Sequence, residues 1–301
     1  MLRLSGILLA IFLAAGFAAD ALAAEKVLYN KKSLYRNITV TDDGEKICMM
    51  FASRGYYTSM QSCQYKDDRD KLVFDYTKLS LAGLLINPDP ERILVVGLGG
   101  GTLPETFHAM FPDAKIDAIE IDEAVVDVAE RYFDFKEEDN IRVIVKDARV
   151  YVKQAGMFGR SYDYIILDAF NGDYIPEHLM TKEWLEEVKR LLAPGGVLVA
   201  NTFSVSRLYH NESVTYEEVF GWIRNVKQES GNRLILTGKF DPVSQADMIE
   251  KAKAMPEDKF ERFGITPMYL AENFRDERDW NEEARVLTDQ YAPVNLLNSK
   301  D

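Results

Sequence analysis

Apolar and polar residues follow two different rhythms along the chain. Between residues 37 and 64, three short runs alternate in character and are separated by turn-forming residues; they span 37–42, 46–52 and 57–64. Such period-two alternation is typical of half-buried β-strands. We therefore expect a small antiparallel β unit within residues 24–70.

From residue 92 onward, near-continuous apolar runs alternate with helical patterns. The apolar runs span 92–97, 115–121, 141–146, 162–168, 196–203 and 233–238, and the helical patterns span 103–111, 123–133, 148–155, 181–192 and 215–228. An earlier stretch, 72–86, also places its apolar residues on one helical face. Near-continuous apolar strands between helices indicate a parallel sheet covered on both faces. Residues 71–301 are therefore expected to form an α/β domain, with a Rossmann-like, doubly wound and mostly parallel sheet.

Residues 1–23 have the pattern of a secretory signal peptide. Arg3 precedes an apolar run at 7–19, and Ala21-Leu22-Ala23 provides a small-residue cleavage site. An N-terminal membrane anchor is the alternative, but the run is shorter than the roughly 20 residues of a membrane span. We expect an exported protein, periplasmic or secreted, with no stable membrane span after cleavage.

Charge and cysteine content add two expectations. The net charge of −13 argues against a nucleic-acid partner, whose phosphates would be repelled, and suits a small cationic substrate. If a turn centres on Gly55-Tyr56, Cys48 and Cys63 face each other across a hairpin. Because an exported chain meets an oxidising compartment, we expect a disulfide between them; two free, half-buried thiols are the alternative.

Ligands of parallel α/β sheets bind at the carboxyl ends of the strands. Gly97, Gly99 and Gly101 follow the first parallel strand and let the backbone approach a ligand where the next helix begins. A dinucleotide fingerprint would require a third glycine at position 102, where Thr102 stands. The mismatch disfavours NAD, and a merely tight strand-to-helix turn is the other alternative.

Carboxylates stand at the ends of the next three strands. Glu120 can accept hydrogen bonds from two ribose hydroxyls, whereas Asp122 could instead cap the following helix. Asp147 can accept from an exocyclic amine such as that of adenine, with a helix N-cap as the alternative. Asp168 opens a polar loop after the fourth strand. This ordered set, with the Pro-Gly-Gly turn at 194–196, resembles the S-adenosylmethionine-dependent methyltransferase fold.

Three further segments narrow the resemblance: FDYTKLSL at 74–81, LDAFNGDYIPEHL at 167–179 and LTDQYAPV at 287–294. With the β unit, they resemble the polyamine aminopropyltransferase family, in its bacterial spermidine synthase-like branch. The resemblance implies a transferase that moves the aminopropyl group of decarboxylated S-adenosylmethionine to a small amine such as putrescine. It implies a homodimer, no permanently bound cofactor and no metal; the three histidines are scattered along the chain.

The resemblance also implies roles for individual residues. The base is Asp168, the substrate-binding residues are Tyr76, Asn171, Asp173 and Gln61, and the donor nucleoside is held by Gly97, Gly99, Gly101, Glu120 and Asp147. Residues 99–102 lack the acid that the family carries in its glycine loop, Thr77-Lys78 replaces a His-Glu pair, and Asn171 replaces a second Asp. Two alternatives therefore stay open: an S-adenosylmethionine-dependent methyltransferase, and a non-catalytic exported homologue that binds a nucleoside or polyamine.

Overall fold

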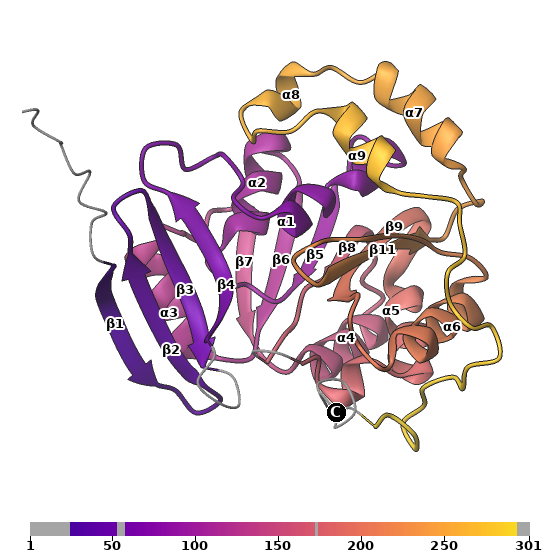
Figure 1. The fold of residues 1–301 in the computed structure, drawn as a ribbon, viewed down its shortest axis with the longest axis horizontal. Coiled ribbons are helices and arrows are strands. Elements are labelled where there is room, and N and C mark those ends of the chain that lie inside the picture. Colours follow the sequence, from indigo (N-terminus) through magenta and orange to yellow (C-terminus); the bar gives the residue numbers. More distant parts are fainter. Residues whose placement is uncertain (1–24, 53–57, 172–173, 294–301) are drawn as a thin grey trace, which may run out of the picture.

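The computed structural model describes residues 25–52, 58–171 and 174–293, which contain two β-sheets (Figure 1). The N-terminal sheet is antiparallel and has the order β1-β2-β3-β4. Its strands are β1 (Lys26–Lys32), β2 (Asn37–Asp42), β3 (Lys46–Ala52) and β4 (Thr58–Tyr65). The expected N-terminal antiparallel β unit is thus confirmed.

The second sheet has seven strands in the order β10-β11-β9-β8-β5-β6-β7. Strands β5 to β9 pair with one another in parallel, whereas β10 and β11 pair in antiparallel fashion at one edge. The strands are β5 (Arg92–Val96), β6 (Lys115–Glu120), β7 (Ile141–Val145), β8 (Tyr162–Leu167), β9 (Leu192–Phe203), β10 (Arg224–Lys227) and β11 (Asn232–Gly238). The strand order reverses between β5 and β8, which is where sheets of this type bind ligands.

Helices cover both faces of the second sheet, as predicted. They are α1 (Asp75–Leu79), α2 (Thr102–Met110), α3 (Glu123–Tyr132), α4 (Ala148–Met157), α5 (Lys182–Leu191), α6 (Tyr209–Phe220), α7 (Gln245–Lys253), α8 (Asp258–Glu261) and α9 (Pro267–Asn273), with the 3-10 helices η1 (Ala82–Leu85) and η2 (Glu177–Leu179). In β5, Ile93 and Val95 pack with α2, α7 and α9, while Leu94 and Val96 pack with α4, α5 and α6. Because both of its faces are buried from Ile93 onward, β5 is apolar from Ile93 to Val96.

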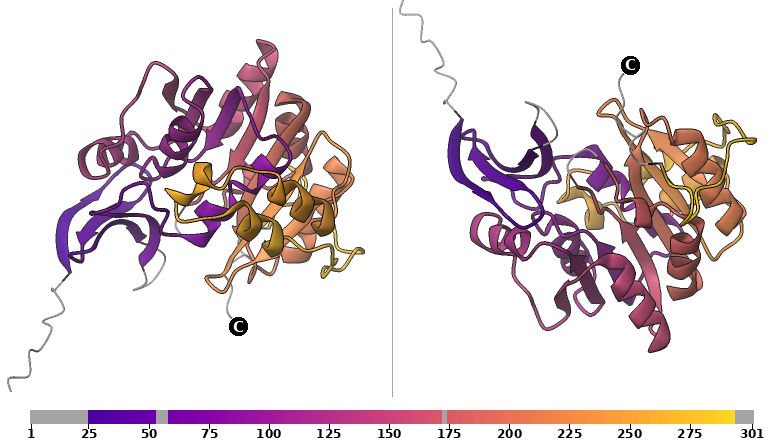
Figure 2. Two further views of the ribbon diagram at one scale, coloured as in Figure 1. Left: turned by 90° about the horizontal axis from the view of Figure 1, so that it is seen from above. Right: turned by 90° about the horizontal axis from the view of Figure 1, so that it is seen from below.

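Helix α3 joins the N-terminal sheet to the larger one, and Figure 2 shows the two sheets side by side with α3 at their junction. Val125 and Val128 of α3 share a buried cluster with Val40 of β2 and Met49 of β3. This packing orients the N-terminal sheet so that β4 lies against the glycine-rich loop after β5, where the backbone N–H of Gly100 donates to a β4 side chain.

Two helix predictions were wrong in extent. The pattern over 72–86 forms α1 followed by η1, because the Tyr164 hydroxyl donates to the Ser80 carbonyl (2.7 Å) and interrupts the helical bonding. The pattern over 215–228 ends as a helix at Phe220. Gly221, with φ of 86°, terminates α6 in the left-handed conformation that glycine tolerates, and strand β10 follows.

Strand β1 was not predicted at all. Its residues are mostly exposed and rich in lysine, so they show no alternation for sequence reasoning to detect. Exposed lysines are common on an edge strand, where they discourage pairing with another chain. In the described part of the chain no helix has both the length and the apolar character needed to cross a membrane.

The predicted disulfide is confirmed. Cys48 of β3 lies opposite Cys63 of β4, and their sulfur atoms are bonded. The register expected from a turn at 55–56 holds from Lys46 to Met49 and shifts by one residue at a bulge beyond Met49. The turn itself lies outside the described residues.

Removal of this disulfide will lower the stability of the protein. A double Cys48→Ala, Cys63→Ala variant loses a cross-link that closes a loop with a sequence separation of 15, which is worth about 3 kcal/mol in the unfolded-chain entropy model. Urea unfolding of oxidised wild type, reduced wild type and the variant measures the loss. Equal midpoints for all three would contradict the prediction.

Candidate functional site

A cavity of about 880 Å³ opens at the carboxyl ends of the parallel strands, with β4 and α1 along one side. Eight of the ten predicted site residues line it: Gln61, Tyr76, Gly97, Gly99, Glu120, Asp147, Asp168 and Asn171. Gly101 does not line it, and Asp173 lies outside the described residues. Among the described residues, no cluster of three or more histidine, cysteine or acidic side chains is arranged to hold a metal ion.

The glycine-rich loop is packed tightly from two sides. Gly97 has φ of 104°, and a Cβ there would collide with the backbone carbonyl of Asp168. Gly99 has φ of 56°, and a Cβ there would lie 2.5 Å from Ser62 Oγ. That hydroxyl accepts a 2.8 Å hydrogen bond from the Gly100 N–H. A side chain at position 99 would therefore disturb the hydrogen bond that holds the loop.

Gly101 lies at the start of α2 and does not line the cavity. It is the N-cap residue of α2 with φ of 84°, and a Cβ there would collide with the ring of Phe135. Its missing side chain lets the loop pack against this ring rather than against a ligand. The conformational reason for glycine was predicted correctly, whereas the nucleoside-binding role that the resemblance implies for Gly101 stays a prediction.

Glu120 ends β6 with its carboxylate held by three backbone N–H groups. These are the N–H groups of Leu98 (3.3 Å), Ile121 (2.9 Å) and Asp122 (3.0 Å). Burial raises the pKa of Glu120 above its usual value, against the effect of Arg36 and these hydrogen bonds. Asp122 instead caps α3 by accepting from the Ala124 N–H (3.1 Å). The helix cap considered for Asp122 is thus confirmed, and the contact of Glu120 with ribose hydroxyls stays a prediction.

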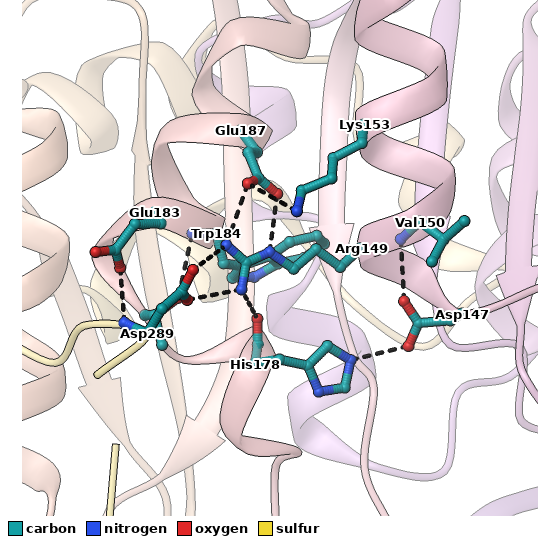
Figure 3. Close-up of polar contacts among 10 residues, drawn as sticks. Asp147, Arg149, Val150, Lys153, His178, Glu183, Trp184, Glu187 and Asp289 are labelled. Atoms are coloured by element: carbon teal, nitrogen blue, oxygen red, sulfur yellow. Dashed lines mark hydrogen bonds and ion pairs between the residues drawn. The ribbon is translucent and has the colours of Figure 1, made fainter. Parts of the chain in front are cut away.

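Asp147 caps α4, which was the alternative interpretation, and it also lines the cavity, as its predicted contact with an adenine amine requires. Its Oδ1 accepts from the Val150 N–H at the start of α4 (3.0 Å), and its Oδ2 pairs with Nε2 of His178 (2.8 Å; Figure 3). Burial would raise the pKa of Asp147, but these two hydrogen bonds outweigh it and lower the pKa. Asp147 is therefore an oriented carboxylate at the cavity wall.

Asp168 follows β8 at the centre of the cavity wall. Its Oδ1 accepts from Asn201 Nδ2 (2.8 Å), and Asn201 in turn accepts from Asn232 Nδ2 (3.0 Å). Burial, with the nearby Glu120 charge, raises the pKa of Asp168 to about 7, although the Asn201 hydrogen bond opposes the rise. A carboxylate with this pKa can exchange a proton near neutrality.

Sequence reasoning missed Asn201. In the sequence, a single asparagine near the end of an apolar strand gives no sign of a functional role. The one available signal is that this strand is the fifth of the parallel series and pairs with the fourth. Only the pairing of β9 with β8 brings the amide to Asp168.

Tyr76 lines the cavity beside strand β4. Its hydroxyl donates to the Gln61 carbonyl (3.0 Å), and its ring stacks on that of Phe74 with 5.6 Å between centroids. Burial and the charge of Asp168 raise the pKa of Tyr76, so the phenol is neutral. Lys78 pairs with Asp75 (2.9 Å) and does not line the cavity, so it does not oppose a cationic ligand.

Asn171 lines the cavity at the mouth of the loop after β8. Its backbone N–H donates to the Tyr174 carbonyl (2.8 Å), and its side-chain amide donates to the Tyr174 hydroxyl. The amide therefore organises its own loop and leaves its carbonyl oxygen as an acceptor.

The fold and the order of these strand-end groups define a Rossmann-like protein of the S-adenosylmethionine-dependent methyltransferase type. The model of the spermine/spermidine synthase domain matches residues 76–226. The chain is 48% identical to a polyamine aminopropyltransferase of Vibrio vulnificus, over 90% of this chain and 91% of that one. It is 36% identical to a polyamine aminopropyltransferase of Chromobacterium violaceum, over 51% of this chain and 58% of that one. The chain belongs to the spermine/spermidine synthase family.

A solved structure supports the fold. A probable spermidine synthase from Corynebacterium glutamicum superposes with a TM-score of 0.63 at 20% identity, covering 86% of this chain and 98% of that one. Both the seven-stranded sheet and the N-terminal antiparallel sheet therefore agree with the architecture that the sequence resemblance implied.

Proposed function

We propose that this protein transfers the aminopropyl group of decarboxylated S-adenosylmethionine to a small amine such as putrescine. The observation that carries the proposal is Asp168, a carboxylate with a pKa raised to about 7. It lies between the nucleoside-side acid Glu120 and the amine-side Tyr76 on the wall of one cavity. Membership of the spermine/spermidine synthase family supports the same reaction.

The reaction needs an oriented nucleophile and a place for one proton. The amine nitrogen forms a bond to the aminopropyl carbon next to sulfur, and the carbon–sulfur bond breaks with its electron pair going to sulfur. Methylthioadenosine leaves, and the proton lost by the nitrogen is accepted by Asp168. Asn201 holds one oxygen of this carboxylate and leaves the other for the amine. Orientation of the amine contributes alongside basicity.

Charge in the cavity favours a cationic acceptor. The acidic side chains on its wall are Asp75, Glu120, Asp147, Asp168 and Glu229. The cationic ones are engaged elsewhere: Arg36 with Asp122 (3.6 Å), Lys146 with Gln154 (2.9 Å) and Lys227 with Asp279 (2.6 Å). Asp75 and Asp147 are themselves paired, with Lys78 and His178, so Asp168 is the carboxylate best placed to meet an ammonium group that enters the cavity.

Calorimetry with four ligands tests the proposal. The purified protein is titrated with S-adenosylmethionine, its decarboxylated form, methylthioadenosine and putrescine, and product formation is followed by mass spectrometry. The expected result is a preference for the decarboxylated donor, with spermidine and methylthioadenosine formed in equal amounts. Preference for intact S-adenosylmethionine with methylated product, or nucleoside binding without turnover, would contradict it.

The substitution Glu120→Gln is expected to weaken donor binding by about 10- to 100-fold. The amide keeps the shape of the side chain but loses the charge that strengthens hydrogen bonds from ribose hydroxyls, a difference of about 1.5–3 kcal/mol. Calorimetry with methylthioadenosine measures it. Glu123→Gln is the matched control, since Glu123 is an exposed acid three residues away. Equal affinities for both variants would show that Glu120 does not hold the nucleoside.

We also infer that the protein works in an oxidising compartment outside the cytoplasm. The Cys48–Cys63 disulfide supports this, because structural disulfides persist mainly in such compartments. Cell fractionation, with alkylation of free thiols before lysis, tests it. Recovery of reduced protein from the cytoplasmic fraction would overturn the inference.

A further inference from the structure

A series of hydrogen bonds and ion pairs links the C-terminal LTDQYAPV motif to the cavity wall (Figure 3). Asp289 of this motif pairs with Arg149. Arg149 lies in the first turn of α4, the helix that the predicted adenine-binding Asp147 caps. Thr181 also donates to Asp289 (2.7 Å), and the backbone N–H of Asp289 donates to Glu183 (2.9 Å). The motif is thus anchored to the helix that begins at the cavity.

Arg149 uses all of its donors in this chain. Its guanidinium bonds both oxygens of Asp289 (2.7 and 2.8 Å) and both oxygens of Glu187 (3.0 and 3.1 Å). Its Nη1 also donates to the backbone carbonyl of His178 (3.3 Å). A planar guanidinium held on both sides by carboxylates has one orientation, so the His178 backbone is held at a fixed place relative to α4.

His178 in turn fixes the orientation of Asp147. Because a carboxylate can only accept, Nε2 of His178 donates to Asp147 Oδ2, while the Val150 N–H holds Oδ1. The hydrogen bond from the Val150 N–H to Oδ1 alone would leave the carboxylate of Asp147 free to rotate, so that Oδ2 would have no fixed position. With both hydrogen bonds made, the remaining lone pair of Asp147 Oδ2 points in one direction. The side chains of Asp147 and His178 both line the cavity.

We propose that His178 is a positioning residue for recognition of the purine amino group, and that Asp289 holds His178 in place through Arg149. The inference rests on the proposed nucleoside donor and extends it. It makes selectivity for a 6-amino over a 6-oxo purine depend on the C-terminal motif. A 6-oxo purine has a carbonyl in place of the amine, so an oriented acceptor repels it and a loosely held one does not.

Two substitutions at one position test the positioning role. His178→Ala removes the donor to Asp147, and His178→Gln restores a neutral N–H donor. Affinities for methylthioadenosine and methylthioinosine are measured by calorimetry. We expect His178→Ala to reduce the preference for the amino nucleoside by about tenfold, the effect of one hydrogen bond, and His178→Gln to restore most of it. A preference ratio unchanged in His178→Ala overturns the inference, as does an equal loss for both nucleosides.

A second pair of variants tests the link to the C-terminal motif. Asp289→Asn should lower the same preference ratio by about threefold to tenfold, because a neutral amide holds Arg149 less firmly. Lys153→Gln is the matched control. Lys153 is on the same helix and pairs with Glu187 (3.6 Å), not with Asp289 or His178. The Lys153→Gln variant should therefore keep the wild-type preference for methylthioadenosine over methylthioinosine. Equal ratios for Asp289→Asn and Lys153→Gln overturn the link.

Failure of the proposed function looks different in these experiments. If wild-type protein binds neither nucleoside, the donor assignment itself is wrong. If wild type prefers methylthioadenosine and the His178 variants keep that preference, only the positioning role is wrong.

Discussion

The variant Asp168→Asn is expected to lose about 10²- to 10⁴-fold in kcat/KM for aminopropyl transfer. Asparagine keeps the size of the side chain but cannot accept the proton from the attacking amine. Nucleoside binding should stay close to wild type, because that contact is assigned to Glu120 and Asp147. Steady-state turnover with decarboxylated S-adenosylmethionine and putrescine measures the first effect, and calorimetry with methylthioadenosine measures the second.

The pH dependence distinguishes a base from a merely polar group. The pKa of Asp168 is raised to about 7, so the carboxylate is mostly protonated below that pH and available as a base above it. Wild-type kcat/KM should therefore fall as the pH drops through about 7, and this inflection should be missing in Asp168→Asn. Turnover that survives the substitution, or an inflection that persists in it, would exclude Asp168 as the base.

The variant Gly97→Ala is expected to lose about 3 kcal/mol of stability and most of its donor affinity. Two effects combine: a residue with a side chain is strained at φ of 104°, and its Cβ collides with the backbone carbonyl of Asp168. Because the obstacle is backbone, it can move only if the end of β8 moves. Urea unfolding and calorimetry with methylthioadenosine measure the two losses.

Gly159→Ala is the matched control for this prediction. Gly159 also has positive φ, 67°, but a Cβ there meets nothing within 4 Å. It should therefore show only the conformational cost, about 1–2 kcal/mol, and full donor affinity. Equal destabilisation of the two variants would mean that the close approach of Gly97 to Asp168 is unimportant.

The parallel sheet was predictable because the burial of each strand leaves a pattern of apolar residues within the strand's own sequence. Strands such as β5 and β8 are buried on both faces over most of their length, so their residues are mainly apolar; Arg92 and Asp163 near their starts are the exceptions. The carboxylates at their ends follow from the same pattern, since polar groups gather where such strands stop. The disulfide was predictable as well, because one hairpin register sets which residues face each other.

What escaped prediction depends on contacts between segments far apart in the chain. Asn201 becomes a partner of Asp168 only when β9 pairs with β8, and His178 becomes a partner of Asp147 only when the loop after β8 returns to α4. Strand β10 was not predicted, for a related reason. Its residues continue the apolar pattern of α6, and only residues 221–223, which begin with the left-handed Gly221, separate the two elements.

The hydrogen bond from the Gly100 N–H to Ser62 has a consequence for building chimeras from this family. Ser62 belongs to the N-terminal sheet, whereas Gly100 belongs to the larger domain, so the two parts cannot be exchanged independently. A transplanted domain with an acid at position 99 would turn the Ser62 hydroxyl away and remove the bond that holds its own loop. A chimera that joins the two parts from different relatives therefore has to keep both partners of this bond, the Ser62 hydroxyl on β4 and the Gly100 N–H of the loop.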